Sequence, residues 1–240
     1  DWLIIPKPNV PTNLPNPNPS PQAPSASPAK VDVLLIAVPK EVVSKYQRIA
    51  TAAGLNLAGL ESESFSLARA LVGNDMGIII LVDFGARSTN LTIIDRGYIY
   101  MSHSAEVSGK ELTKMVSSGL GVAPQRAEEL KKTSGVAAVG MEKGIAQVIS
   151  PLIDKLVLEI QRMNDSFLKK ENRRVEKVIL TGGSANLPGL NEYLGHHLGL
   201  EVVTGNPFSK IKFDAVLEPI FRRDLSSQLA VAAGLALRED

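Results

Sequence analysis

The residues best suited to chemistry lie in a short stretch between two expected strands. Asp83 follows the apolar run Ile78–Val82, and Gly85, Ser88 and Thr89 come soon after it. A carboxylate at the end of a buried strand is costly unless it is paired or bound to a metal ion or water. Glycine lets backbone N–H groups approach an anion, and the hydroxyls add donors. The stretch predicts either a hairpin that grips phosphate, with Asp83 placed for Mg²⁺ or its water, or a plain hairpin with a capping Asp.

A second glycine turn follows the expected strand Val175–Leu180. The run Thr181-Gly182-Gly183-Ser184 leads to Pro188, where a helix is expected to begin and to continue to Leu198. Such a junction places bare backbone against something flat or anionic at a helix N-terminus. The other interpretation is a tight turn without a ligand.

A third pair of residues lies on one face of an expected helix. Glu128 and Lys131 are three positions apart on a helix that begins at Pro124. Together they could hydrogen-bond a sugar hydroxyl and a base edge. The other interpretation is a solvated face with an intrahelical salt bridge.

Composition narrows the function classes. The 240 residues carry 26 Lys+Arg and 25 Asp+Glu, a net charge of +1, which argues against a general basic field for nucleic acid. Cysteine is absent, so no disulfide, thiolate nucleophile or cysteine-ligated metal is expected. No apolar run approaches the ~18 residues of a membrane helix, and no targeting segment is visible. A soluble, cytosolic protein is expected.

The elements that must position these residues alternate between strands and helices, which predicts an α/β fold. Nine of the fifteen prolines lie between Pro6 and Pro28, so this stretch is expected to be a flexible loop between strands at Trp2–Ile5 and Val31–Val38. A helix is expected to begin at Pro39 and to end at Gly54. The other expected elements are strands at Leu57–Leu60, Ile78–Asp83, Asn90–Asp95, Tyr98–Ser102 and Glu201–Val203, and helices at Ser64–Val72, Gly109–Ser118, Pro124–Lys132, Met141–Lys170 (broken or kinked at Pro151) and Leu225–Leu237.

Taken together and in order, the motifs resemble those of the actin/Hsp70/sugar-kinase ATPase superfamily, in which they are the second phosphate loop, an adenosine-binding helix and the adenosine loop. Within it, the chain is most similar to the PilM-type actin-like proteins of type IV pilus assembly, from about Val31 onward. The supporting segments include LVDFGARSTNLTIIDRGYI, AEELK, VILTGGSANLPGL and QLAVAAGLALRED. The resemblance implies an α/β, actin-like (ribonuclease H-like) ATPase fold of two lobes, with ATP and Mg²⁺ as cofactors.

The resemblance also implies a role for each matching residue. Asp83 would position Mg²⁺ or water, and Glu63 would orient the attacking water as a second catalytic carboxylate. The residues that would hold the β- and γ-phosphates are Gly85, Ala86, Arg87, Ser88 and Thr89. Those that would line the nucleoside are Gly109, Lys110, Glu128 and Lys131. Those that would pack on adenine and ribose are Gly182, Gly183 and Ser184.

The same resemblance divides the chain. Residues 1–30 would be a Pro-rich linker within a small subdomain inserted in the first lobe, and residues 31–60 the rest of that subdomain. Residues 61–76 would be a connecting helix of the first lobe, 77–224 the second lobe, and 225–240 a closing helix that returns to the first. The first phosphate loop of the superfamily is not found, so the first lobe is expected to be incomplete and the chain to be a fragment.

The resemblance implies an ATP-binding scaffold of type IV pilus assembly, with at most a slow ATPase activity. It would lie at the inner face of the bacterial cytoplasmic membrane and serve twitching motility. Its partner would be the N-terminal tail of a PilN-type membrane protein, held in a groove formed with Val31–Leu60, near Tyr46 and Arg48. Pilus motor ATPases would be further partners, and nucleic acid would not be one.

Three alternatives stay open at this stage. One is an FtsA-type cell-division relative, which typically ends in an amphipathic membrane helix after a linker, whereas this chain stops directly after its closing helix. Another is a sugar-kinase-like phosphotransferase, which would need a catalytic base and sugar-binding polar residues in the first lobe. The third is a scaffold that has lost nucleotide binding, because Ala86 and Arg87 stand where many relatives have glycine.

Overall fold

The computed structural model describes residues 2–5, 32–137, 143–209, 211, 212, 214, 216 and 226–238, with only the backbone of Trp2–Ile5, Asp32 and Lys143. The chain divides into two compact units, Asp1–Leu60 and Glu61–Asp240, each of which is described by itself. The expected Pro-rich linker lies outside the described residues.

Unit 1 holds a strand pair and one helix. β1 (Trp2–Ile5) pairs antiparallel with β2 (Asp32–Leu35), which confirms a strand on each side of the Pro-rich stretch. α1 (Lys40–Ala52) begins after Pro39, and Gly54 at φ +66° follows its end, as expected. α1 buries none of its residues. The expected strand at Leu57–Leu60 is wrong: the segment is irregular, its two end leucines are exposed, and no described strand pairs with it.

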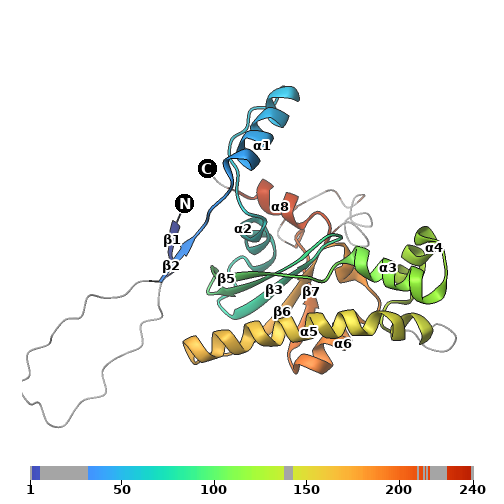
Figure 1. Ribbon diagram of the computed structural model, residues 1–240. Helices are drawn as coiled ribbons and strands as arrows, with labels where there is room; N and C mark the ends of the chain where they lie inside the picture. Colours follow the sequence, from blue (N-terminus) through green and yellow to red (C-terminus); the bar gives the residue numbers. More distant parts are fainter. Residues whose placement is uncertain are drawn as a thin grey trace, which may run out of the picture. The chain divides into compact units, whose positions relative to one another are not determined.

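Unit 2 is built on a five-stranded mixed sheet in the order β5-β4-β3-β6-β7 (Figure 1). β3 (Ile78–Phe84), β4 (Thr89–Asp95) and β5 (Tyr98–Ala105) form an antiparallel meander. β6 (Lys177–Thr181) runs parallel to β3, and β7 (Glu201–Thr204) runs parallel to β6. β3 is buried on both faces, which explains its unbroken apolar run.

A long helix covers one face of this sheet. α5 (Lys143–Glu171) runs along one side of the sheet in Figure 1, and its fully buried residues include Ile149, Ile153, Leu156, Ile160 and Phe167. The expected break at Pro151 is wrong, because the helix continues through it. Pro151 is exposed, and Ser150 Oγ donates to the carbonyl of Gln147, the group that a residue-151 N–H would otherwise bond. The side chain thus satisfies the acceptor that proline leaves free.

The remaining helices of unit 2 are shorter than α5. α3 (Gly109–Leu120), α4 (Pro124–Ser134) and α6 (Leu190–Leu198) are present, the last beginning two residues later than expected. The expected helix Ser64–Val72 is α2 (Glu63–Leu67) followed by a π-helical turn, η1 (Ala68–Val72). α8 (Ala230–Ala236) packs on α2 and is shorter than the expected closing helix, whose first residue lies outside the described part.

Candidate functional site

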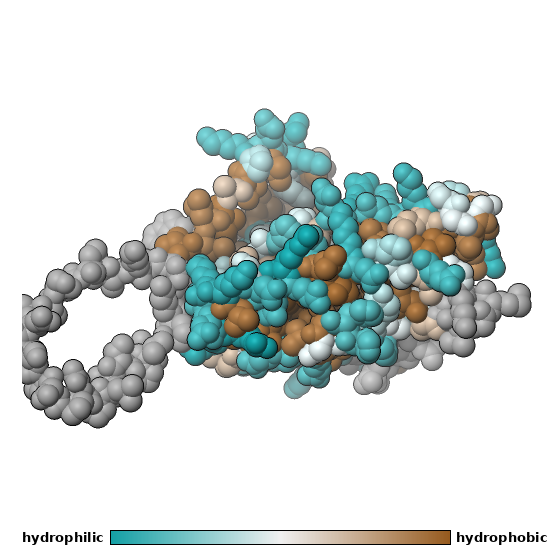
Figure 2. All heavy atoms as spheres, turned by 60° about the horizontal axis from the view of Figure 1, so that its bottom comes forward, coloured by the Kyte–Doolittle hydropathy of each residue, from teal (hydrophilic) through white to brown (hydrophobic). Residues whose placement is uncertain are grey.

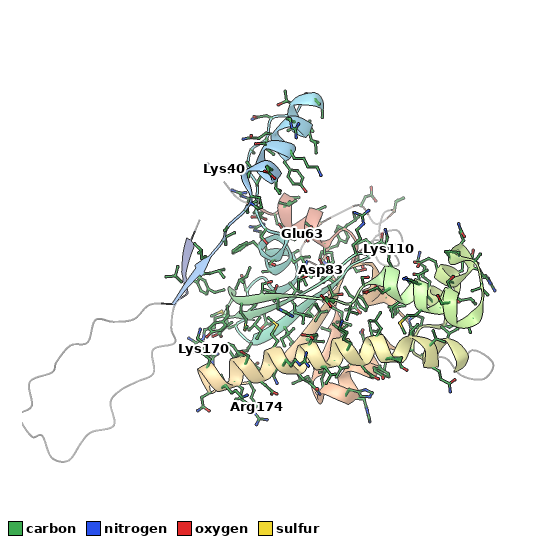
Figure 3. The ribbon with its side chains drawn as sticks, viewed as in Figure 1. Lys40, Glu63, Asp83, Lys110, Lys170 and Arg174 are labelled. Carbon is green, nitrogen blue, oxygen red and sulfur yellow. The ribbon has the colours of Figure 1, made fainter. Side chains whose placement is uncertain are left out.

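Asp83 lies near the end of the central strand, beside a second carboxylate. In the sheet it stands opposite Asn90 of β4 and Thr181 of β6. Burial raises the pKa of Asp83 to about 6, and the negative charge of Glu63 adds to the effect. Glu63 is the first residue of α2, and Figure 3 shows the two side chains near each other. The structure therefore brings together the two carboxylates singled out in the sequence.

The turn from Gly85 to Ser88 is braced by the start of α3. The carbonyls of Gly85 and Ala86 accept hydrogen bonds from the N–H groups of Gly109 and Lys110, both at 3.0 Å. Gly85 N–H closes the turn on the carbonyl of Ser88, at 3.0 Å. The N–H groups of Ala86 and Arg87 donate to no other backbone group in the described part of the chain, and their residues are exposed. Free donors next to a helix N-terminus favour an anion.

Thr89 does not share this exposed position. It is fully buried, and its hydroxyl donates to the carbonyl of Val107 at 2.6 Å. The hydroxyl thus ties β4 to the segment that leads into α3. Of the five residues that the sequence predicted to hold phosphate, Ala86, Arg87 and Ser88 are exposed at the tip of the turn, Gly85 is half-buried and Thr89 is buried.

The second glycine turn lies directly against Asp83. Gly182 has φ +85°, and a Cβ there would lie 2.6 Å from Asp83 Oδ1 and from the carbonyl oxygen of Phe84. Ser184 is buried, and a Cβ on Gly109 would lie 2.6 Å from its hydroxyl. Gly183 is exposed, and a Cβ on it would meet nothing within 4 Å. Gly182 and Ser184 therefore allow the second glycine turn to pack closely against the Asp83 turn and the start of α3. Gly183 leaves an exposed backbone surface without a side chain.

Lys131 braces the first turn of α3 from α4. Its ammonium group is buried and donates to the carbonyl of Gly109 at 3.1 Å, to Thr113 Oγ1 at 3.0 Å and to Glu128 Oε2 at 2.6 Å. Burial alone would raise the pKa of Glu128, but the hydrogen bonds from Lys131 and Thr113 hold it below its usual value. A solvated salt-bridged face is thus the wrong interpretation for Lys131. Glu128 is half-exposed, and its other oxygen lies 3.3 Å from Lys132.

Three supporting residues were missed in the sequence. The carbonyl of Ser227 accepts hydrogen bonds from Thr181 Oγ1 at 3.1 Å and from Gly182 N–H at 3.2 Å. Thr113 completes the Glu128–Lys131 group. Ser108 caps α3 through Glu111 N–H, and the Ser-x-x-Glu spacing could have revealed it. No local signal marks Ser227, because one of its partners, Thr181, lies 46 residues away.

The residues present could hold Mg²⁺ only if water and phosphate oxygens supplied its remaining ligands. The described part of the chain holds no group of three or more side chains suited to a metal ion. Mg²⁺ commonly binds one or two carboxylates and completes its shell with water and phosphate oxygens. Asp83 and Glu63 supply that number of carboxylates.

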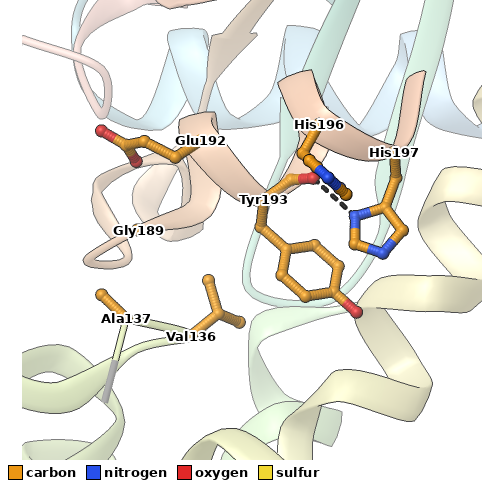
Figure 4. Close-up of a pocket in the computed structure, with 7 residues that line it drawn as sticks. All are labelled: Val136, Ala137, Gly189, Glu192, Tyr193, His196 and His197. Atoms are coloured by element: carbon orange, nitrogen blue, oxygen red, sulfur yellow. Dashed lines mark hydrogen bonds between the residues drawn. The ribbon is translucent and has the colours of Figure 1, made fainter. Parts of the chain in front are cut away.

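A separate pocket of about 460 Å³ lies beside α6. It is lined by Val136, Ala137, Gly189, Glu192, Tyr193, His196 and His197 (Figure 4). Tyr193 stacks on His197, and its hydroxyl donates to Asp154 at 2.5 Å. The pocket shares no lining residue with the Asp83 turn, so the two are distinct places in unit 2.

Comparison with known families gives one match over most of the chain. Residues 20–240 match the family described as type IV pilus assembly protein PilM. Among curated proteins, the cell division protein FtsA of Staphylococcus epidermidis is 23% identical over 188 residues, which are 69% of this chain and 40% of that protein. FtsA of Pseudomonas aeruginosa is 25% identical over 221 residues, which are 80% of this chain and 51% of that protein.

Solved structures give matching folds. A chain of the PilM-PilN type IV pilus biogenesis complex is 26% identical with a TM-score of 0.69, covering 83% of this chain and 58% of that one. The ethanolamine utilization protein EutJ of Carboxydothermus hydrogenoformans is 24% identical with a TM-score of 0.61, covering 84% and 62%. MreB5 of Spiroplasma citri bound to AMPPNP is 17% identical with a TM-score of 0.60, covering 83% and 64%. The expected actin-like α/β fold is confirmed, and the chain spans less than two thirds of each of these proteins.

Proposed function

The chain belongs to the family of type IV pilus assembly protein PilM, and from that premise we propose that it is an ATP-binding scaffold of type IV pilus assembly. One observation carries the nucleotide half of the proposal. The exposed tip of residues 86–88 lies at the N-terminus of α3, and Asp83, on which the charge of Glu63 acts, lies against the turn that holds the exposed Gly183. The arrangement suits a molecule with both phosphates and a flat ring.

Each residue then has a defined task. Backbone N–H groups of Ala86 and Arg87, with the guanidinium of Arg87, bind phosphate oxygens. Asp83 holds Mg²⁺ or a water molecule bound to it, and Glu63 orients a water molecule. Gly183 packs on the base, and Lys131 keeps the start of α3 in place. Bound Mg²⁺ would supply positive charge that offsets the negative charge of the phosphates. ATP hydrolysis is at most slow.

Calorimetric titration with Mg-ATP tests this half. We expect micromolar binding by the protein in its longest natural form, and loss of that binding in Asp83→Ala. Asp165→Ala, which removes an exposed carboxylate of α5, is the matched control and should bind as the wild type does. Absence of binding in the wild type would refute the proposed ATP binding. The protein would then be a scaffold that has the actin-like fold but binds no nucleotide.

Unit 1 is the proposed partner site. Its described part exposes Val42, Tyr46 and Ile49 on one side of α1, and Figure 2 shows apolar side chains open to view along this unit. Such a surface suits an apolar tail, and the similar structure is a PilM-PilN complex. We assign to it the N-terminal tail of a PilN-type protein, which would hold this chain at the inner face of the cytoplasmic membrane. No described helix is both long and apolar enough to cross a bilayer.

A tail peptide tests the partner site. Labelled peptide should lose at least about tenfold in affinity with Tyr46→Ser or Arg48→Glu, as a lost central anchor does at other interfaces. Leu158→Ser removes an exposed apolar residue of unit 2 and should leave the affinity unchanged. Equal affinity for all variants would place the tail elsewhere. Pilus motor ATPases are proposed as further partners and can be assayed with the same variants.

The FtsA matches favour a second candidate, a filament-forming cell-division relative. Sedimentation with Mg-ATP and anionic vesicles separates the two. A scaffold stays in the supernatant unless the tail of its partner is attached to the vesicle, whereas a filament former pellets without it.

A further inference from the structure

Glu61, the first residue of unit 2, is bound on both carboxylate oxygens. Arg69 Nη1 donates to Oε1 at 2.8 Å and Arg69 Nη2 donates to Oε2 at 2.9 Å, and the hydroxyl of Ser66 donates to Oε1 at 2.5 Å. The side chain of Glu61 is only 12% exposed. Hydrogen bonds from Arg69 hold the pKa of Glu61 at about 2, well below its usual value, so the carboxylate is charged throughout the physiological range.

Arg69 also reaches a residue far along the chain. Its Nη1 donates to the carbonyl of Gly234 in α8 at 2.7 Å, across 165 residues of sequence. The side chain starts from the π-helical turn η1, and such turns occur often at functional sites. One guanidinium therefore joins the start of unit 2 to α8. The planar fork of arginine allows this, whereas a lysine ammonium could not make the bidentate pair.

The backbones of α2 and α8 touch next to this ion pair. A Cβ on Gly234 would lie 1.9 Å from the carbonyl oxygen of Ser66, so only glycine permits the crossing. On the opposite side, Thr92 Oγ1 donates to Ser64 Oγ at 3.3 Å, which ties α2 to the sheet. The first turn of α2 is thus held from two sides.

Glu63 lies between these anchors and has no anchor of its own. It makes no side-chain hydrogen bond among the described residues, yet its charge acts on Asp83. We propose that Glu61, Arg69 and the Gly234 carbonyl form a clasp that fixes the backbone of α2 and so aims Glu63 at Asp83. Arg69 is then a positioning residue for the nucleotide site. Only this second step rests on the proposed function.

Hydrogen–deuterium exchange on the ligand-free protein tests the clasp. In Arg69→Gln we expect amide exchange to rise at least about tenfold in residues 62–67 and 230–236, with no change in β3 and β6. Arg69→Lys should give a smaller rise, because it keeps the charge without the fork. In the double variant Glu61→Gln with Arg69→Gln, amide exchange in these residues should be no faster than in Arg69→Gln alone. Arg126→Gln, which removes an exposed pair with Glu129, is the control. Unchanged exchange, or a uniform rise through unit 2, would overturn the clasp.

A double-mutant cycle tests the positioning step. Arg69→Gln should weaken Mg-ATP binding about tenfold in the wild type and leave it unchanged in Glu63→Ala, because the residue through which it acts is then gone. An equal loss in both backgrounds would show that Arg69 does not act through Glu63. A wild type that binds no Mg-ATP would refute the proposed function and the positioning step with it, while the exchange result would still decide the clasp.

Discussion

α1 in unit 1 and α5 in unit 2 have the same kind of sequence pattern and opposite burial. Tyr46 and Ile49 of α1 are 51% and 53% exposed, whereas Ile153 and Phe167 of α5 are fully buried. Both helices repeat apolar residues at helical spacing. The comparison teaches that such a pattern shows that a helix has an apolar side, and only the tertiary structure shows what covers it. α5 has its sheet, whereas α1 has no buried residue in the described part of the chain.

The largest expected effect is in the core of unit 2. Phe167→Ala should lower the free energy of unfolding by about 3–5 kcal/mol, because it leaves a cavity beside the ring of Tyr100, which meets Phe167 edge to face at 5.0 Å. Urea unfolding followed by circular dichroism measures the change. Leu158→Ala on the exposed side of the same helix is the control and should cost under about 0.5 kcal/mol. Equal losses in the two variants would contradict the burial difference within α5.

Asp83 is the exception inside the well-packed unit. Its pKa of about 6 means that the folded state binds its proton more readily than the unfolded chain does. The ionised carboxylate therefore lowers the free energy of unfolding. This loss is complete above about pH 6 and disappears as the pH falls toward 4. Asp83→Asn should raise the free energy of unfolding by about 2–3 kcal/mol at pH 7.5 and by much less at pH 4.5. Urea unfolding at the two pH values measures this, and a gain independent of pH would contradict it.

The contact between α2 and α8 depends on the absence of a single atom, the Cβ of residue 234. Gly234→Ala should cost about 1–3 kcal/mol, since its methyl group would overlap the carbonyl of Ser66 and push the helices apart. Thermal unfolding measures the change. Gly144→Ala in α5 is the matched control, because its Cβ meets only Leu120 at 3.9 Å, and alanine there should stabilise the helix by about 0.5–1 kcal/mol. A tolerated Gly234→Ala would mean that the two helices do not pack this closely.

The smallest effect is expected in α1. Ile49→Ala should change the free energy of unfolding by less than about 0.5 kcal/mol, because the side chain is already exposed when the chain is folded. The same urea measurement applies, with Val157→Ala of unit 2, which is 5% exposed, as the buried counterpart. A loss of 2 kcal/mol or more for Ile49→Ala would show that the apolar side of α1 is covered after all.

The sequence by itself determined those features of the structure that depend on residues close together in the chain. The apolar run before Asp83, the start of α1 after Pro39 and its end at Gly54 are local signals, and each was predicted. The order of the Asp83 turn, the Glu128–Lys131 pair and the Gly182-Gly183 turn was sufficient to indicate the family. Such features need no knowledge of distant contacts, because backbone conformation near glycine and proline is set within a few residues.

The tertiary structure alone decided what depends on residues far apart in sequence. It showed that Thr89 and Ser184 are buried while residues 86–88 and Gly183 remain exposed. It kept α5 continuous at Pro151, and it left Leu57–Leu60 without a partner strand in the described part. It joined Thr181 to Ser227 and Arg69 to Gly234, across 46 and 165 residues. The physical reason is that burial and hydrogen bonding depend on which surfaces meet, and a local pattern shows only that a surface needs a partner.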